Sequence, residues 1–402
     1  MNVTIRPCTL RGRVQAPPSK SYAHRMLICA ALAEGESRIH GISGSEDMYA
    51  TMECVEALGG ATAREGDTVT VTPGRGGELD GAVFPCRESG STLRFFIPLA
   101  LARGGSTVFT GTGRLMARGV DVYEELFARK GLRLTRDAGS IAVSGRLRSG
   151  EYTLRGDVSS QFVSGLLFAL PLLEGDSTIH VLPPVESRRY IDITVDAMAA
   201  FGVAVEERER NTFFVPGGQR YRPRELQVEG DWSNAAALYG LNALGAELEI
   251  TGLNGGSIQG DRACVEILQR LEQPGSVTDL SGCPDLGPVL FAVAAAKHGG
   301  VFTGTRRLRI KESDRARAMA DELKKFGVDV HVEENSVTVA DMELRPPREA
   351  LSGHNDHRIV MAMTLLATLC GGEIGGAEAI RKSYPDFFEV LKGLGLEAEY
   401  GD

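Results

Sequence analysis

Residues 17–35 read PPSKSYAHRMLICAALAEG, and this stretch sets the pattern for the whole chain. A polar head with Lys20, Ser21 and Arg25 leads into an apolar run that ends before Gly35. Two prolines block a helix upstream, a serine can cap the first turn, and the glycine can end the helix. A helix that is apolar on nearly all sides is a buried helix. Because its cations lie at the positive end of the helix dipole, we expect an anionic ligand beside them; the alternative is a capped core helix with cations in water.

The same arrangement of a polar head and an apolar run occurs five more times. These heads lie at residues 89–94, 159–161, 231–234, 284–285 and 355–358. Each run is followed by a short β-branched segment, and most repeats continue with an amphipathic helix and a pair of strands. The amphipathic helices are predicted at residues 48–58, 120–130, 191–201, 262–271 and 315–326.

A repeat of roughly 50 to 75 residues decides the architecture. Alternating helices and strands with hairpins predict an α/β (α+β) protein with mixed sheets covered by helices. Three repeats per half give two similar domains, with six helix N-termini around a cleft between them. The polar, proline-bearing segment 217–225 is the predicted crossover, followed by a strand of the fourth repeat near residues 226–230. The alternative is a solenoid of stacked repeats.

Composition restricts the function. The chain has 402 residues and a net charge of −9, which argues for two domains and against a nucleic-acid or anionic-membrane surface. Seven scattered cysteines without a CxxC pair indicate reduced thiols, and with no signal-peptide core they predict a cytoplasmic protein. His354 and His357 form an HxxH without a further ligand nearby, so no metal is expected. The chain also has no GxxxxGK[ST] phosphate loop.

The polar residues at the six heads are cations, hydroxyls and a few carboxylates. They are Lys20, Ser21, Arg25, Arg94, Ser159, Ser160, Gln161, Asp285, Asp356, His357 and Arg358. Residues 311–315 (KESDR) and 381–385 (RKSYP) add two clusters before outer helices, and Arg114 and Arg118 precede another. Arginines, lysines and helix N-termini together suit small substrates with phosphate and carboxylate groups. Acid or base chemistry falls to Asp285, Glu312, His357 or a lysine.

Nine motifs along the chain resemble those of one family, the 3-phosphoshikimate 1-carboxyvinyltransferases or EPSP synthases. They are PSKSYAHR, ESGSTLRF, DVSSQFVSGLL, SRRYIDITVDAM, VEGDWSNAA, the head at residues 284–285, RIKESDRA, NDHRIVMA and RKSYPDFF. The resemblance covers essentially the whole length. It implies two domains of three βαβαββ units each, with buried parallel helices and an inside-out, α/β barrel-like arrangement. The first domain would comprise residues 1–14 plus 227–402 and the second residues 15–226, with the active site in the interdomain cleft.

The resemblance also implies the reaction: transfer of the enolpyruvyl group of phosphoenolpyruvate to the 5-hydroxyl of shikimate 3-phosphate, in the shikimate pathway to chorismate and the aromatic amino acids. It implies a cytoplasmic monomer without metal or organic cofactor, and no nucleic-acid or membrane partner. The residues that would bind shikimate 3-phosphate are Lys20, Ser21, Arg25, Ser159, Ser160, Gln161, Ser187, Tyr190, Asp285 and Lys311.

A second set of residues would surround phosphoenolpyruvate by the same resemblance. These residues are Lys20, Gly90, Ser91, Arg118, Gln161, Arg315, Arg358 and Lys382. Asp285 would act as the base at the 5-hydroxyl, assisted by Lys311. Glu312, with Lys20 sharing the task, would handle the proton at the methylene carbon.

Some positions depart from the family's commonest pattern. Glu88 stands where asparagine is frequent, Ser91 where threonine is, and Gly119 where proline is. The segment before Lys311 is short, and Arg307 or Arg309 is expected to replace a phosphate-binding asparagine. Because Gly90 leaves the phosphoenolpyruvate pocket open, inhibition by glyphosate is expected.

Two other functions compete with this interpretation. The related transferase acting on UDP-N-acetylglucosamine usually carries a loop cysteine shortly before the arginine that matches Arg118. Residues 111–118 here read GTGRLMAR and contain none. A non-catalytic anion-binding relative is the other alternative. The residues that argue against it are Lys20, Asp285, Glu312, Arg358 and Lys382.

Overall fold

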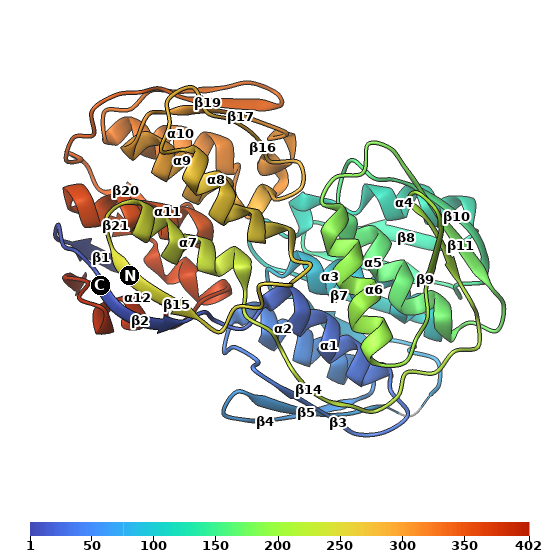
Figure 1. Cartoon of the computed structure of the whole chain (residues 1–402). Coiled ribbons are helices and arrows are strands. Elements are labelled where there is room, and N and C mark those ends of the chain that lie inside the picture. Colours follow the sequence, from blue (N-terminus) through green and yellow to red (C-terminus); the bar gives the residue numbers. More distant parts are fainter. Residues whose placement is uncertain (75, 402) are drawn as a thin grey trace. The chain divides into compact units, whose positions relative to one another are not determined.

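The computed structural model describes residues 1–74 and 76–401, and the chain divides into two compact units (Figure 1). Unit 1 comprises Met1–Ser19 and Gly230–Asp402, and unit 2 comprises Lys20–Glu229. These limits lie a few residues beyond those expected from the sequence. Residues up to Gln15 stay with unit 1 because β2 (Arg11–Gln15) pairs in parallel with β15 (Glu247–Thr251).

All six apolar helices form where the polar heads predicted them. They are α1 (Lys20–Leu32), α3 (Gly90–Arg103), α5 (Ser160–Ala169), α7 (Trp232–Ala243), α9 (Gly287–Ala296) and α11 (His357–Cys370). Ser89, Ser159, Asp231 and Asp356 cap four of them, each accepting a hydrogen bond from a backbone N–H of the first turn. The head residues are therefore fixed at helix starts by local hydrogen bonds.

Two glycines allow these helices to approach closely. A Cβ at Gly165 in α5 would lie 2.4 Å from the Arg94 carbonyl oxygen of α3, and one at Gly240 in α7 would lie 2.6 Å from Leu365 of α11. In unit 1, α7, α9 and α11 contact one another, and in unit 2 α3 contacts α5 (Figure 1). The apolar helices therefore form the core of each unit.

Five outer helices form close to their predicted positions, and a sixth follows the polar cluster at residues 381–385. They are α2 (Glu46–Ala57), α4 (Asp121–Arg129), α6 (Arg188–Ala200), α8 (Cys264–Arg270), α10 (Arg315–Lys325) and α12 (Phe387–Gly393). The start predicted for the fourth repeat's helix, residue 262, lies instead in a 3₁₀ turn (Gly260–Ala263). The α-helix proper begins only at Cys264.

The strands of residues 1–74 and 76–401 form five four-stranded sheets and one two-stranded sheet. In each four-stranded sheet the first two strands are parallel and the remaining pairs are antiparallel. Unit 2 has three of these sheets. The strand order of the first is β14 (Glu225–Gln227), β3 (Ser37–His40), β5 (Thr68–Thr72), β4 (Ala61–Glu65), and that of the second is β6 (Val83–Pro85), β7 (Ser106–Thr110), β9 (Ser140–Ser144), β8 (Arg133–Arg136). The strand order of the third is β10 (Gly150–Arg155), β11 (Ser177–Leu182), β13 (Thr212–Val215), β12 (Glu206–Glu209). Those of unit 1 are β16 (Val277–Asp279), β17 (Gly300–Thr303), β19 (Ser336–Val339), β18 (Val330–Val332); and β20 (Leu351–Ser352), β21 (Gly372–Gly375), β1 (Asn2–Ile5), β22 (Ala398–Gly401).

Long-range pairing changes the expected repeat in three places. The strand expected in the fourth repeat near residues 226–230 is β14, and it belongs to unit 2 because it pairs with β3 of the first repeat. The fourth repeat has no hairpin, since β15 pairs only with β2 in the part of the chain that the structure describes. In the sixth repeat, β1 and β22 from the two chain ends pair antiparallel and replace the expected hairpin. Each of these strand orders is that of an open sheet, so none of the described sheets closes into a barrel.

Within the described residues, no helix is long and apolar enough to cross a membrane.

Candidate active site

Arg25 organises the first group of predicted site residues, which we call the Arg25 cluster (Ser21, Arg25, Tyr190 and Thr194). Its guanidinium is buried and donates to the carbonyl oxygens of Ser21 (2.7 Å) and Tyr190 (3.0 Å) and to the Thr194 hydroxyl (2.8 Å). Burial lowers the pKa of Arg25 to about 10, which leaves it a cation at neutral pH. The guanidinium therefore ties the start of α1 to the start of α6.

Two serines predicted to bind shikimate 3-phosphate lie at helix starts in the same unit. Ser187 precedes α6 with a left-handed backbone (φ 52°), which is uncommon for a residue other than glycine. Ser159 caps α5, with its hydroxyl accepting from the Gln161 N–H at 3.3 Å. Both helix starts present backbone N–H groups, the donors that phosphate oxygens prefer.

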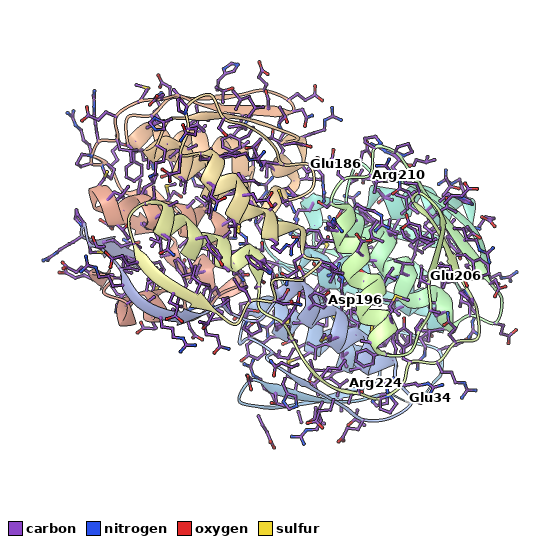
Figure 2. All side chains as sticks on the ribbon, viewed as in Figure 1. Glu34, Glu186, Asp196, Glu206, Arg210 and Arg224 are labelled. Carbon is purple, nitrogen blue, oxygen red and sulfur yellow. The ribbon has the colours of Figure 1, made fainter. Side chains whose placement is uncertain are left out.

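Lys20 has an acidic partner that the sequence did not suggest. Its ammonium lies 2.9 Å from the carboxylate of Asp47 in the first turn of α2, and both side chains are mostly buried. Tyr22, two residues further along α1, donates to Asp196 of α6 at 2.9 Å; Figure 2 labels Asp196. These contacts hold the opening helix between α2 and α6.

His24, on the opening helix between Lys20 and Arg25, lies in the core. Burial, with Lys20 and Arg25 nearby, holds the pKa of its imidazole well below the usual range, so the ring is neutral. Its Nδ1 lies 2.6 Å from the Thr51 hydroxyl. The head of α1 thus combines one buried neutral ring with two cations.

Arg94 organises a second group, the Arg94 cluster (Gly90, Ser91, Arg94, Arg118 and Gln161). Its guanidinium donates to the Gln161 side-chain oxygen (2.6 Å) and to the carbonyl oxygen of Arg118 (3.2 Å). The Gln161 amide in turn donates to the Ser91 hydroxyl at 2.8 Å. A Cβ on Gly90 would lie 3.0 Å from the Arg118 guanidinium carbon. Four predicted phosphoenolpyruvate residues are therefore brought together by an arginine that the site prediction omitted.

The third group, the Arg315 cluster, lies in unit 1 and contains Asp285, Lys311, Glu312, Arg315 and Asp356. The buried Arg315 guanidinium donates to Asp285 (2.7 Å), Glu312 (2.8 Å) and Asp356 (2.9 Å). The Lys311 ammonium lies 3.0 Å from the same Asp285 oxygen. The predicted base and the predicted acid are thus held on one arginine.

The charges of this cluster determine its protonation state. Burial opposes ionisation of Asp285, but Lys311, Arg315 and Arg358 outweigh it and hold the pKa of its carboxyl well below the usual range. Burial, with Arg307 and Arg315 nearby, lowers the pKa of Lys311 although Asp285 opposes the shift. Asp285 is therefore a carboxylate at neutral pH and, in the absence of substrate anions, a weak base.

Asp356 is a head residue that was not assigned to the site. Its fully buried carboxylate accepts from Arg315, from the Ser313 hydroxyl (2.9 Å) and from the Arg358 backbone N–H (2.9 Å). It therefore joins the cap of α11 to the start of α10. No local pattern distinguishes this role from that of an ordinary helix cap.

The two remaining predicted cations of unit 1 contact the backbone of neighbouring segments. Arg358 donates to the carbonyl oxygen and hydroxyl of Ser233 at the start of α7. Lys382, at the end of a 3₁₀ helix (Ala377–Lys382), donates to the carbonyl oxygen of Asn355 at 2.7 Å. Both cations therefore lie at the starts of apolar helices.

Arg307 or Arg309 is expected to replace a phosphate-binding asparagine of the family. Arg307 lies close enough to Lys311 for its positive charge to help lower the pKa of that ammonium. Arg309 donates instead to the Glu333 carbonyl oxygen at 2.7 Å. The carboxylate of Glu88 lies over Gly113, where a Cβ would be 2.7 Å from one of its oxygens.

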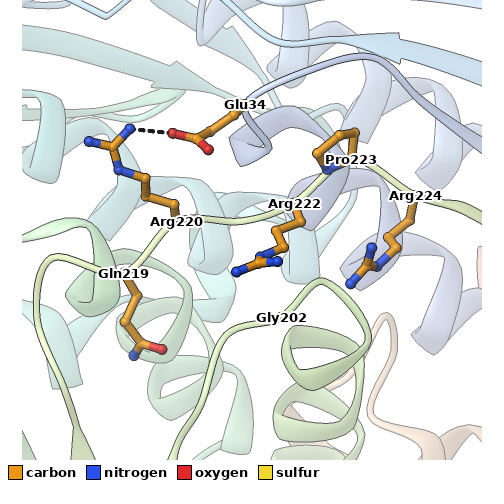
Figure 3. A pocket seen from close by; sticks show the side chains of 7 residues that line it. All are labelled: Glu34, Gly202, Gln219, Arg220, Arg222, Pro223 and Arg224. Atoms are coloured by element: carbon orange, nitrogen blue, oxygen red, sulfur yellow. Dashed lines mark hydrogen bonds and ion pairs between the residues drawn. The ribbon is translucent and has the colours of Figure 1, made fainter.

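A pocket of about 600 Å³ lies away from these residues, at the C-terminal ends of α1 and α6 (Figure 3). Arg220 is paired with Glu34 there, and Arg224 donates to the last carbonyl of α6, that of Ala200, at 2.8 Å. None of the predicted site residues is among those that line it: Glu34, Gly202, Gln219, Arg220, Arg222, Pro223 and Arg224. Two of its arginines thus have structural partners, one of them capping a helix end.

Among residues 1–74 and 76–401, no group of three or more His, Cys, Asp or Glu side chains could hold a metal ion.

The fold is similar to that of two solved enolpyruvyl transferase structures. An EPSP synthase structure from Acinetobacter baumannii superposes with a TM-score of 0.81 and 24% identity and covers 100% of both chains. The enolpyruvyl transferase NikO from Streptomyces tendae superposes with a TM-score of 0.76 and 18% identity over 100% of this chain and 98% of that one. At these identities the likeness shows the fold alone.

Sequence comparison narrows this class to one family. Residues 6–391 match the family described as EPSP synthase (3-phosphoshikimate 1-carboxyvinyltransferase). Proteins named 3-phosphoshikimate 1-carboxyvinyltransferase from Clostridium kluyveri and Clostridium acetobutylicum are 40% and 39% identical, over 99% and 98% of this chain and 98% and 97% of theirs. The chain belongs to the EPSP synthase family, whose members are transferases.

Proposed function

We propose that this protein transfers the 1-carboxyvinyl group of phosphoenolpyruvate to the 5-hydroxyl of shikimate 3-phosphate, releasing phosphate. Family membership and the names of its relatives support this proposal. The observation that carries it is the Arg315 cluster, in which a candidate base, Asp285, and a candidate acid, Glu312, share one buried arginine. Addition and elimination on an enol ether need both groups close together.

The proposed reaction proceeds by addition and then elimination. The 5-hydroxyl oxygen bonds to C2 of phosphoenolpyruvate while its proton passes to Asp285. C3 accepts a proton from Glu312, which must take up that proton when the substrates bind. The C2–O bond to phosphate then breaks and the departing phosphate takes the proton held by Asp285. Glu312 takes a proton back from C3, which restores the double bond. Each proton transfer requires a side chain within hydrogen-bond reach of the reacting atom.

Substrate binding would raise the basicity of Asp285. In the free protein, three cations hold the pKa of this carboxyl well below its usual range. When the phosphate and carboxylate of phosphoenolpyruvate pair with Arg315, Arg358 and Lys382, the two arginines, which are among those three cations, are partly neutralised. Asp285 is therefore proposed to become a stronger base only when phosphoenolpyruvate is bound.

The Arg25 cluster and the serines at the starts of α5 and α6 suit the binding of shikimate 3-phosphate. Ser21, Ser159, Ser160, Ser187 and Tyr190 provide hydroxyls and helix-start N–H groups for the phosphate and ring hydroxyls. Arg25 already donates to three protein oxygens, so its proposed role is to fix these groups and add positive charge. Lys20, paired with Asp47, and the Arg94 cluster complete the proposed substrate contacts.

Phosphate release tests the proposed function. The protein is incubated with phosphoenolpyruvate and, in separate reactions, shikimate 3-phosphate, UDP-N-acetylglucosamine or neither acceptor. Phosphate release in the reaction with shikimate 3-phosphate, and in neither of the others, supports the proposal. Release only with the UDP-sugar would assign the related activity, and no release would identify a non-catalytic relative. A monomeric state and a cytoplasmic location stay predictions.

A further inference from the structure

A left-handed turn of two non-glycine residues precedes α11. His354 and Asn355 have φ values of 47° and 52°, and they connect β20 to the cap residue Asp356. Side chains other than glycine rarely adopt this conformation, so consecutive examples persist only where neighbouring contacts enforce them. His354 belongs to the HxxH pair noted in the sequence, and the proposed reaction gives this histidine no role.

Glu322 of α10 supplies the contacts that hold this turn. Its carboxylate is buried and accepts from His354 Nε2 (2.8 Å), the Ser352 N–H (2.9 Å) and the Lys325 ammonium (2.9 Å). Lys325 also donates to the Ala350 carbonyl oxygen (2.9 Å), on the other side of β20. Burial opposes ionisation of Glu322, but His354, Lys325 and the Ser352 N–H outweigh it and hold the pKa of its carboxyl below the usual range.

This turn also positions the partners of two cations of the candidate active site, Lys382 and Arg315. The Asn355 carbonyl oxygen accepts from the Lys382 ammonium at 2.7 Å. The next residue, Asp356, accepts from Arg315 at 2.9 Å and caps α11. A change in the backbone at His354 would therefore move the partners of both cations.

We infer that Glu322 and His354 are positioning residues for phosphoenolpyruvate, acting through the 354–355 turn to place Lys382 and Arg315. Neither side chain is proposed to contact the reacting atoms. The inference rests on the proposed function, which assigns both cations to that substrate. A purely structural role is the alternative, in which the pair only stabilises unit 1.

The two roles differ in which substrate is affected. Most of the proposed shikimate 3-phosphate residues, including the Arg25 cluster, lie in unit 2, whereas the turn lies in unit 1. His354→Leu should raise the KM for phosphoenolpyruvate about tenfold, because misplaced side chains lose affinity steeply. The Kd for shikimate 3-phosphate alone should stay within about twofold of the wild-type value.

Conservative and matched variants sharpen the test. His354→Gln retains an N–H donor and should restore part of the affinity lost in His354→Leu. Glu322→Gln keeps the shape but removes the charge, and should show the same selective rise in KM. Val337→Ala, in the core at β19, is the control, which should lower the melting temperature without changing either constant.

The steady-state constants of all four variants decide between the roles. A wild-type protein that turns over, with His354→Leu raising the phosphoenolpyruvate KM alone, supports positioning. If His354→Leu leaves that KM within about twofold, or changes both substrate constants equally, the inference is wrong while the proposed function stands. A wild-type protein without turnover overturns the proposed function and this inference with it.

Discussion

Arg315 is the residue on which the candidate chemistry of unit 1 depends. All three of its guanidinium nitrogens donate to carboxylates, and it joins Asp285, Glu312 and Asp356 in a buried site. Burial disfavours its charge, but the three carboxylates outweigh this and raise the pKa of Arg315 above its ordinary value. The arginine is a permanent cation that sets the distance between the proposed base and acid.

Asp285→Ala should reduce kcat by about 10²- to 10⁴-fold, the range typical for loss of a general base. Substrate binding should remain largely intact, because the phosphate and carboxylate contacts are made by other residues. Steady-state kinetics with both substrates measure the effect. Asp321→Ala, an exposed position of α10, is the matched control. A decrease in kcat of less than about tenfold would exclude Asp285 as the base.

Gly90→Ala should weaken phosphoenolpyruvate and glyphosate together. The added Cβ would lie 2.9 Å from an Arg94 nitrogen and 3.0 Å from the Arg118 guanidinium carbon, so both arginines must move. We expect a rise of about tenfold in the phosphoenolpyruvate KM and in the inhibition constant of glyphosate. Gly139→Ala, with no atom within 4 Å of its new Cβ, is the control. Wild-type activity that persists at millimolar glyphosate would contradict the expected pocket.

Which site residues the sequence could predict depends on how local their signal is. Ser159 and Asp356 lie at helix caps, and a cap followed by an apolar run is visible in a few residues of sequence. Asp47, Arg94 and Glu322 act through partners on other elements, so only packing reveals them. The resemblance supplied roles for individual residues, but not these supporting contacts.

At the scale of elements, close helix packing determines where the polar heads lie. Tyr123 of α4 donates to the carbonyl oxygens of Arg94 in α3 and Phe162 in α5, both at 2.9 Å. Gly165 faces the same hydroxyl, because a Cβ there would lie 2.3 Å from it. The starts of α3 and α5, which carry Gly90 and Gln161, are therefore held by one buried tyrosine.

Gly165→Ala should destabilise unit 2 by about 3 kcal/mol, since overpacking against backbone atoms cannot be relieved by a rotamer change. Thermal or urea unfolding of the full chain measures it. Gly139→Ala again serves as the control and should change stability by less than about 0.5 kcal/mol. A Gly165→Ala protein as stable as the wild type would show that α3 and α5 are not packed as described.

Glu322→Gln should lower the stability of unit 1 by about 3 kcal/mol at neutral pH, because it leaves buried donors around a neutral amide. The folded pKa of Glu322 lies below its unfolded value, so its contribution is present above about pH 5 and is lost as the pH falls through the folded pKa. Melting temperatures of variant and wild type should converge as the pH falls below the folded pKa of Glu322. A difference that stays constant from neutral to acidic pH would contradict this assignment.

At the scale of the whole molecule, the repeat was predictable but its strand exchanges were not. Six apolar helices follow from local patterns of caps and apolar runs, which need no long-range information. The pairing of β2 with β15 and of β14 with β3 joins segments about 200 residues apart, and the chain ends share one sheet. No short segment specifies such partners, so the fourth and sixth repeats differ from the expected unit.

Our main proposal is that Asp285 is the base in transfer of the 1-carboxyvinyl group of phosphoenolpyruvate to shikimate 3-phosphate. The most direct measurement is the rate of phosphate release from phosphoenolpyruvate, with and without shikimate 3-phosphate, by wild type and by Asp285→Ala. We expect release that requires shikimate 3-phosphate and falls by at least about 10²-fold in the variant. Release that is independent of this acceptor, or equal in both proteins, would contradict this proposal.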